Sequence, residues 1–135
     1  MAKTKGLVIK ERTVGESDRL VTLLTADYGL VNAFVRNAKQ LKNKLSASTS
    51  LFAYCEFSIY QGRDANVVDN ATVIEMFFDL RSDIEKLAVA QYFAQLAYEL
   101  ANEGQPEEEM LSIILNSLHL LCKGEKSIVQ IKSVV

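Results

Sequence analysis

Five short segments rich in β-branched and aromatic residues, each followed by turn-forming residues, dominate the chain up to Glu75. The turns contain Gly15, Gly29 and Gly62, and glycine favours the backbone conformations that tight turns need. Apolar runs this short, between such turns, predict β-strands rather than helices. We therefore expect strands at 6–11, 20–25, 30–36, 52–61 and 67–75.

The third and fourth predicted strands are separated by a long polar insertion, whereas the other connections are short. Five strands with one long connection match the count expected of an OB-type barrel. Because side chains alternate along a strand, the core face of each strand can be assigned from its apolar positions. The expected core-facing residues are Val31, Ala33 and Val35 in the third strand, and Ala53, Cys55, Phe57 and Ile59 in the fourth.

Helix-forming patterns replace the strands near Asp79. Ser82 and Glu85 have the spacing of a capping box, which predicts a helix that begins there and continues to Ala101. This segment is apolar on most of its circumference, so the helix should be surrounded by other parts of the protein. The sequence thus predicts an α+β chain, with an OB-fold domain at 1–78 and a helical domain at 79–135.

A second helix is predicted to begin at Pro106, with the acidic residues 107–109 in its first turn and an apolar stripe that ends near Lys123. A third helix is predicted to begin near Ser127. The apolar residues of 128–135 have no visible partner, so we expect an incomplete helical region. That segment should pack against the barrel, be disordered, or pair with another copy.

The net charge of −2 hides an uneven distribution of charged residues. Residues 1–64 carry a net charge of +4, and residues 65–135 carry −6. A basic half joined to an acidic half predicts an anionic partner for the first half alone. The alternative is that both halves are simply solvated surfaces of unrelated sign.

The residue patterns of common enzymes and metal sites are not found in the sequence. His119 is the single histidine, and its one neighbouring candidate ligand, Cys122, is too few for a zinc site. There is no phosphate-binding glycine loop and no arrangement that would activate a serine nucleophile. We therefore expect a protein without catalytic residues, metal or cofactor.

Cys55 and Cys122 lie in apolar runs, where they are expected to be small buried hydrophobic residues rather than a disulfide. The sequence shows neither a signal peptide nor an apolar stretch of the length that crosses a membrane. These observations predict a cytoplasmic protein.

The insertion between the third and fourth strands is strongly basic from Arg36 to Lys44. Arg36, Lys39, Lys42 and Lys44 provide four cations, and no acidic residue interrupts them. Lys and Arg bind nucleic acid by displacing condensed counterions from phosphates, so this loop is a candidate phosphate contact. An ordinary solvated loop would have a similar composition.

Aromatic residues on the polar faces of two strands strengthen the nucleic-acid hypothesis. Phe34 in the third strand and Tyr54 in the fourth point away from the core, and unpaired bases stack on such rings. The alternative is that the helical region covers this surface and the rings belong to an interdomain core. The complete predicted DNA-binding set is Arg19, Phe34, Arg36, Lys39, Lys42, Lys44, Tyr54 and Arg63, with Arg12 as a further candidate.

Several motifs resemble the opening of the RecO family of recombination mediators. They are Lys3–Ile9, Gly15–Thr25, Gly29–Val31, the basic loop, Phe57–Tyr60 before Gly62, and Val73–Glu75 through Leu87. Together the motifs cover nearly the whole chain. Asn37 stands where the family usually has glycine, but asparagine also adopts the left-handed conformation. The chain ends before the position of the cysteine cluster that often binds zinc in the family.

The resemblance implies an OB domain followed by a helical domain. It also implies binding of single- and double-stranded DNA, strand annealing, and help in replacing single-stranded-DNA-binding protein with the RecA recombinase. Recombination protein R and single-stranded-DNA-binding protein are the implied partners, with RecA as an indirect one. The alternative function is an OB-like interaction module whose exposed face binds a protein rather than DNA.

Overall fold

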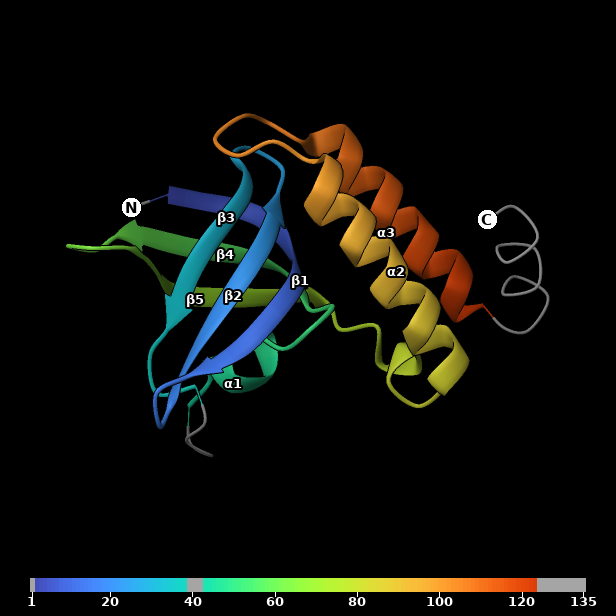
Figure 1. The fold of residues 1–135 in the computed structure, drawn as a ribbon, viewed down its shortest axis with the longest axis horizontal. Coiled ribbons are helices and arrows are strands. Elements are labelled where there is room, and N and C mark those ends of the chain that lie inside the picture. The colour runs from blue at the N-terminus through green and yellow to red at the C-terminus, as the bar shows by residue number, and fades with distance from the viewer. Residues whose placement is uncertain (1, 39–42, 124–135) are drawn as a thin grey trace.

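A computed structural model describes residues 2–38 and 43–123 (Figure 1). The five strands are β1 (Ala2–Val14), β2 (Asp18–Thr25), β3 (Gly29–Val35), β4 (Tyr54–Gln61) and β5 (Asn66–Glu75). The helices are α1 (Leu45–Ser48), α2 (Ile84–Leu100) and α3 (Glu108–Cys122), with one 3-10 turn, η1 (Phe78–Leu80).

The strands form a closed barrel in the order β1-β2-β3-β5-β4. β3 and β5 are parallel, and the other pairs are antiparallel. This arrangement confirms the predicted α+β fold with a five-stranded OB-like barrel. β1 is longer than expected because its first half pairs with β4 and its second half with β2. A register shift between Val8 and Lys10 marks the bulge that bends β1 between these two partners.

The barrel interior is filled by the residues that strand alternation predicts. Val31, Ala33 and Val35 of β3 face it, together with the alternating residues of β4 and the segment before it, Ala53, Cys55, Phe57 and Ile59. The Cys55 side chain is fully buried, as expected of a small hydrophobic residue.

A second core joins one outer flank of the barrel to the helices. The side chains of Leu7, Leu24 and Leu30 point outward from the barrel. They pack with apolar residues of α2 and α3, including Phe93 and Leu118. Figure 1 shows α2 and α3 side by side along this flank. Within the described residues, none of the helices is both long and apolar enough to cross a membrane.

The β2–β3 turn and the α2–α3 connection are joined by backbone hydrogen bonds. Leu30 N–H donates to Asn102 C=O at 2.9 Å, and Gly104 N–H donates to Tyr28 C=O at 2.9 Å. Gly29 makes this approach possible, because it has a φ of +65° and a Cβ there would lie 2.1 Å from the Asn102 oxygen. The helices therefore contact the barrel through these backbone hydrogen bonds as well as through the shared core.

The expected starts of β4 and α2 are wrong. β4 begins at Tyr54 rather than at position 52, because Phe52 has a left-handed φ of 69° that ends the extended backbone. The capping residue of α2 is Asp83 rather than Ser82, and its carboxylate accepts from the backbone N–H groups of Glu85 and Lys86. The Ser82 hydroxyl instead donates to the carbonyl of Asp79, which closes the turn before the helix.

The second long helix begins at Glu108, two residues later than expected. The Glu107 carboxylate accepts from Asn102 N–H and therefore belongs to the connection between the helices. The short helix α1 was not predicted. The expected third helix near Ser127 and the apolar segment 128–135 lie outside the described residues.

Candidate nucleic-acid interface

An outward-facing row of side chains crosses the barrel away from the helices. Phe34 pairs with Leu20 of β2 on one side and with Val67 of β5 on the other. Val67 also pairs with Tyr60 of β4. Paired residues point to the same face of a sheet, so Phe34 and Tyr60 flank Val67 on the outer face. Val67 is only 5% exposed, whereas both aromatic side chains are partly exposed.

Exposed cations lie on both sides of this row, displaced from it along the strand direction. β3 and β5 run parallel, so Arg36, which follows Phe34, lies on one side of the row. The β4–β5 turn that carries Arg63 precedes Val67 and lies on the other side. Arg12 continues the row on β1, because it pairs with Leu20. Arg12, Arg36 and Arg63 are all exposed. A strand lying across the two rings would meet positive charge on either side.

The ends of the basic loop are fixed by hydrogen bonds. The Asn43 amide donates to the carbonyls of Arg36 and Asn37, each at 2.9 Å. Asn37 has a φ of 56°, the left-handed conformation expected of an asparagine in place of glycine. Its N–H donates to the Asp18 carboxylate at 2.9 Å. Lys44 is exposed at the second end, whereas Lys39 and Lys42 lie outside the described residues.

Two of the predicted DNA-binding residues, Arg19 and Tyr54, make structural contacts instead of lying on this face. Arg19 is half-buried, and its Nη1 donates to Ser46 C=O at 2.7 Å and to Thr49 Oγ1 at 3.0 Å. Tyr54 packs against the core shared with the helices, where burial raises the pKa of its phenol. The structure therefore does not bring Tyr54 together with Phe34.

Tyr60 is an aromatic residue of this face that was not among the DNA-binding residues predicted from the sequence. It lies on the same predicted polar face of the fourth strand as Tyr54, so alternation alone gave no reason to prefer it. The distinguishing signal was its position near the turn at Gly62, at the end of β4 that the helices do not cover.

His119 and Cys122, the two residues considered as metal ligands, lie on α3 and not on this face. His119 is exposed on α3 rather than enclosed by apolar residues, and its ring centroid is 4.9 Å from that of Phe77. Cys122 is half-buried on the same helix, where burial is the largest influence that raises its pKa. No three His, Cys, Asp or Glu side chains within residues 2–38 and 43–123 gather as a metal site would require.

Two family models match this chain. Residues 1–77 match the model described as recombination protein O N terminal, and residues 81–132 match recombination protein O C terminal.

Proteins named DNA repair protein RecO are similar to it over most of its length. The protein of Acetivibrio thermocellus is 38% identical over 129 residues, which cover 96% of this chain and 51% of the relative. That of Caldicellulosiruptor bescii is 36% identical over 125 residues, covering 93% and 51%. The chain thus spans about half the length of these curated relatives. Since the first model alone matches more than half of the chain, the chain belongs to the RecO family of DNA repair proteins.

Proposed function

We propose that the outer face carrying Phe34 and Tyr60 binds DNA. The observation that carries this proposal is the pairing of both residues to the sides of Val67, with Arg36 and Arg63 on opposite sides of the row. Unpaired bases stack on exposed aromatic rings, and arginines contact the phosphates between them. The face thus offers both kinds of contact that a single strand needs.

The charge distribution favours this face over the helices. Residues 65–135 carry a net charge of −6, whereas the barrel strands and the basic loop supply most of the cations. Phosphates are repelled by an acidic surface and attracted by a basic one. Residues 1–78 are accordingly proposed as the DNA-binding domain, and 79–135 as a helical domain that supports it.

The proposed role is in recombinational repair, as the names of the relatives suggest. The chain would bind single- and double-stranded DNA, assist annealing and aid loading of RecA, without catalysing a reaction itself. Recombination protein R and single-stranded-DNA-binding protein are the proposed protein partners, in the cytoplasm. A face that contacts phosphates suits duplex as well as single strands, because both expose backbone phosphates.

Fluorescence anisotropy with labelled single- and double-stranded oligonucleotides, repeated at several salt concentrations, tests the proposal. We expect the logarithm of the binding constant to fall linearly with the logarithm of salt concentration. The competing function is a protein-interaction module, since Leu20, Phe34 and Tyr60 could also contact an apolar partner. No oligonucleotide binding at low salt would favour that function and overturn the proposal.

A further inference from the structure

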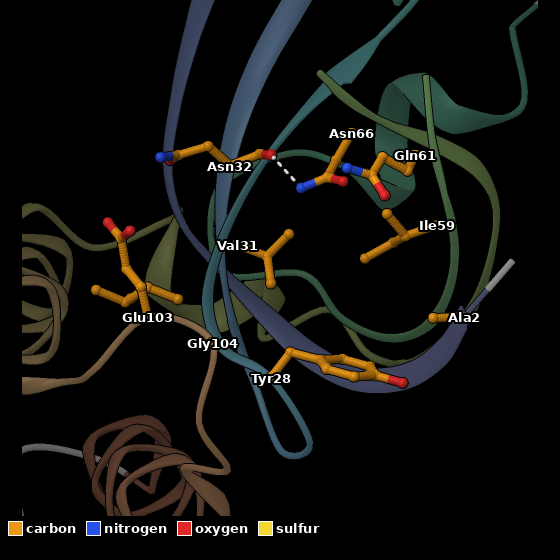
Figure 2. A pocket seen from close by; sticks show the side chains of 10 residues that line it. Ala2, Tyr28, Val31, Asn32, Ile59, Gln61, Asn66, Glu103 and Gly104 are labelled. Carbon is orange, nitrogen blue, oxygen red and sulfur yellow. Dashed lines mark hydrogen bonds between the residues drawn. The ribbon is translucent and has the colours of Figure 1, made fainter. Parts of the chain in front are cut away.

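A cleft of about 730 Å³ opens at the end of the barrel beside the proposed DNA-binding face (Figure 2). It exists because β3 pairs with β5 only at Ala33–Asn66 and Phe34–Val67. The earlier part of β3 is therefore separated from β4 and from the start of β1, and the cleft occupies the space between them.

The polar end of the cleft follows from strand alternation. Ile59 faces the barrel interior, so Gln61, two residues later, faces the same way at the barrel mouth. Asn66 pairs with Gln61 and shares its side. Figure 2 shows these two amides next to one another, with Tyr28 across the cleft and apolar Val31 and Ile59 between.

The amide groups retain hydrogen-bonding capacity. Asn66 Nδ2 donates to Asn32 C=O at 3.4 Å, and the described residues provide no donor to the Asn66 Oδ1 atom. For the Gln61 side chain, residues 2–38 and 43–123 provide no hydrogen-bond partner. Amides both donate and accept, so this end of the cleft can complement a mixed pattern of donors and acceptors.

Backbone hydrogen bonds fix the position of Tyr28 on the opposite wall of the cleft. Tyr28 N–H donates to Thr25 Oγ1 at 3.1 Å, and its carbonyl accepts from Gly104 N–H at 2.9 Å. Its side chain remains 42% exposed. Because the Tyr28 backbone is fixed, only the side-chain torsions of its ring need to be ordered when a flat ligand stacks on it.

The charge of the described lining residues disfavours the phosphate end of a nucleotide. Glu103 is the one charged side chain among the lining residues, and it is acidic. The Tyr28 ring, the apolar Val31 and Ile59 and the two amides have the chemistry that suits a neutral, flat group with polar edges. An added peptide strand fits less well, because Leu30 N–H and Asn32 C=O on this edge of β3 already have partners.

We propose that this cleft takes one unpaired nucleobase from a bound DNA strand, with Gln61 and Asn66 contacting its polar edge. The inference rests on the proposed function, since Tyr60 and Val67 of the DNA-binding face directly adjoin Gln61 and Asn66. A strand that crosses the face can thus turn a base inward while its phosphates stay outside.

The test uses the full chain and a fluorescein-labelled oligothymidylate. Tyr28→Ala is expected to weaken binding about tenfold, within the range for loss of one stacked base, without changing the salt slope. Tyr28→Phe should restore the affinity. Tyr92→Ala is the matched control, because Tyr92 is 45% exposed on α2 and does not line the cleft. An abasic oligonucleotide of equal length should bind the parent and Tyr28→Ala equally.

Photocrosslinking of the parent with an oligonucleotide that carries 5-iodouracil provides a readout independent of any variant. We expect the linked peptide to contain Tyr28, and Gln61→Ala with Asn66→Ala to reduce the yield. Oligonucleotide binding with unchanged affinity in Tyr28→Ala, and cross-links only elsewhere, would overturn the base site while leaving the proposed function intact. A parent that binds no oligonucleotide would overturn both.

Discussion

Arg19 at the start of β2 donates a hydrogen bond of 3.0 Å to the hydroxyl of Thr49, which follows α1 and is completely buried. The same guanidinium group donates to Ser46 C=O at 2.7 Å. These two bonds hold the end of the long β3–β4 connection against the barrel wall. An arginine selected from the sequence as a DNA contact therefore has a structural role in the fold.

Arg19→Ala should lower the free energy of unfolding by about 1–3 kcal/mol, because hydrogen bonds from a charged donor are lost in a half-buried site. Urea denaturation, with an unchanged dependence on denaturant concentration, measures the loss. Arg12→Ala on the neighbouring strand is the control, since its exposed side chain should change stability by less than about 0.5 kcal/mol. Equal losses in the two variants would contradict the structural role of Arg19.

Gly29→Ala and Gly15→Ala should differ strongly in stability although both glycines have nearly the same φ. A left-handed φ alone costs alanine about 1–2 kcal/mol, which is the loss expected for Gly15→Ala. At Gly29 the new Cβ would also lie 2.1 Å from Asn102 O and 2.6 Å from Gln105 O. We expect a loss of about 3 kcal/mol or more there, because backbone must move. Thermal unfolding of both variants makes the comparison, and similar midpoints would show that the two segments are not fastened together.

Cys55 should make stability depend on alkaline pH. Burial raises the pKa of its thiol from an ordinary 9.0 to about 11. Because the folded-state value is the higher one, the stabilisation is fully present below pH 9 and is lost as the pH rises towards about 11. The free energy of unfolding should therefore fall more steeply across this window in the parent than in Cys55→Ala. Parallel pH profiles from urea denaturation would refute this assignment.

Alternation along the strands was enough to predict the interior of the barrel. Residues expected deep inside, such as Ala33 and Phe57, are fully buried because side chains that fill a closed barrel have little access to solvent, whereas Val31 at the barrel mouth is partly exposed. The five-strand count and the turns at Gly15, Gly29 and Gly62 then determined the fold class. Within the barrel the missed features were boundaries, as at Phe52, where one left-handed residue ends a pattern that reads as continuous strand.

Strand alternation could not predict which outward-facing residues are covered by the helices and which remain exposed. Alternation places Tyr54 and Tyr60 on one outer face of β4, but it carries no information on which part the helices cover. Tyr54 packs with the helices, whereas Tyr60 lies beside Val67 and Phe34. The hydrogen bond between Leu30 N–H and Asn102 C=O likewise cannot be predicted from the sequence, since it joins backbone groups of distant segments.

Phe34→Ala and Tyr60→Ala should each weaken single-strand binding by about 1–3 kcal/mol without changing the salt dependence, because a stacked base is lost and no phosphate contact is. Tyr54→Phe is the matched control, since it keeps the packed ring and removes only the phenol oxygen. Anisotropy titrations at several salt concentrations give both quantities. Unchanged affinity in the Phe34 and Tyr60 variants would show that DNA binds at another face of the protein.

Replacing Arg36, Lys39, Lys42 and Lys44 together by glutamine should flatten the salt dependence of DNA binding. If all four contact phosphates, they contribute a log–log slope of about −3 for single strands, from roughly −0.7 per contact. Binding should weaken for all sequences alike, because phosphate contacts do not distinguish bases. Stability should change little, since exposed charges contribute about 0–1 kcal/mol even when paired. An unchanged affinity and slope would show that the loop is only a solvated connection, and the phosphate contacts would then be sought at Arg12 and Arg63.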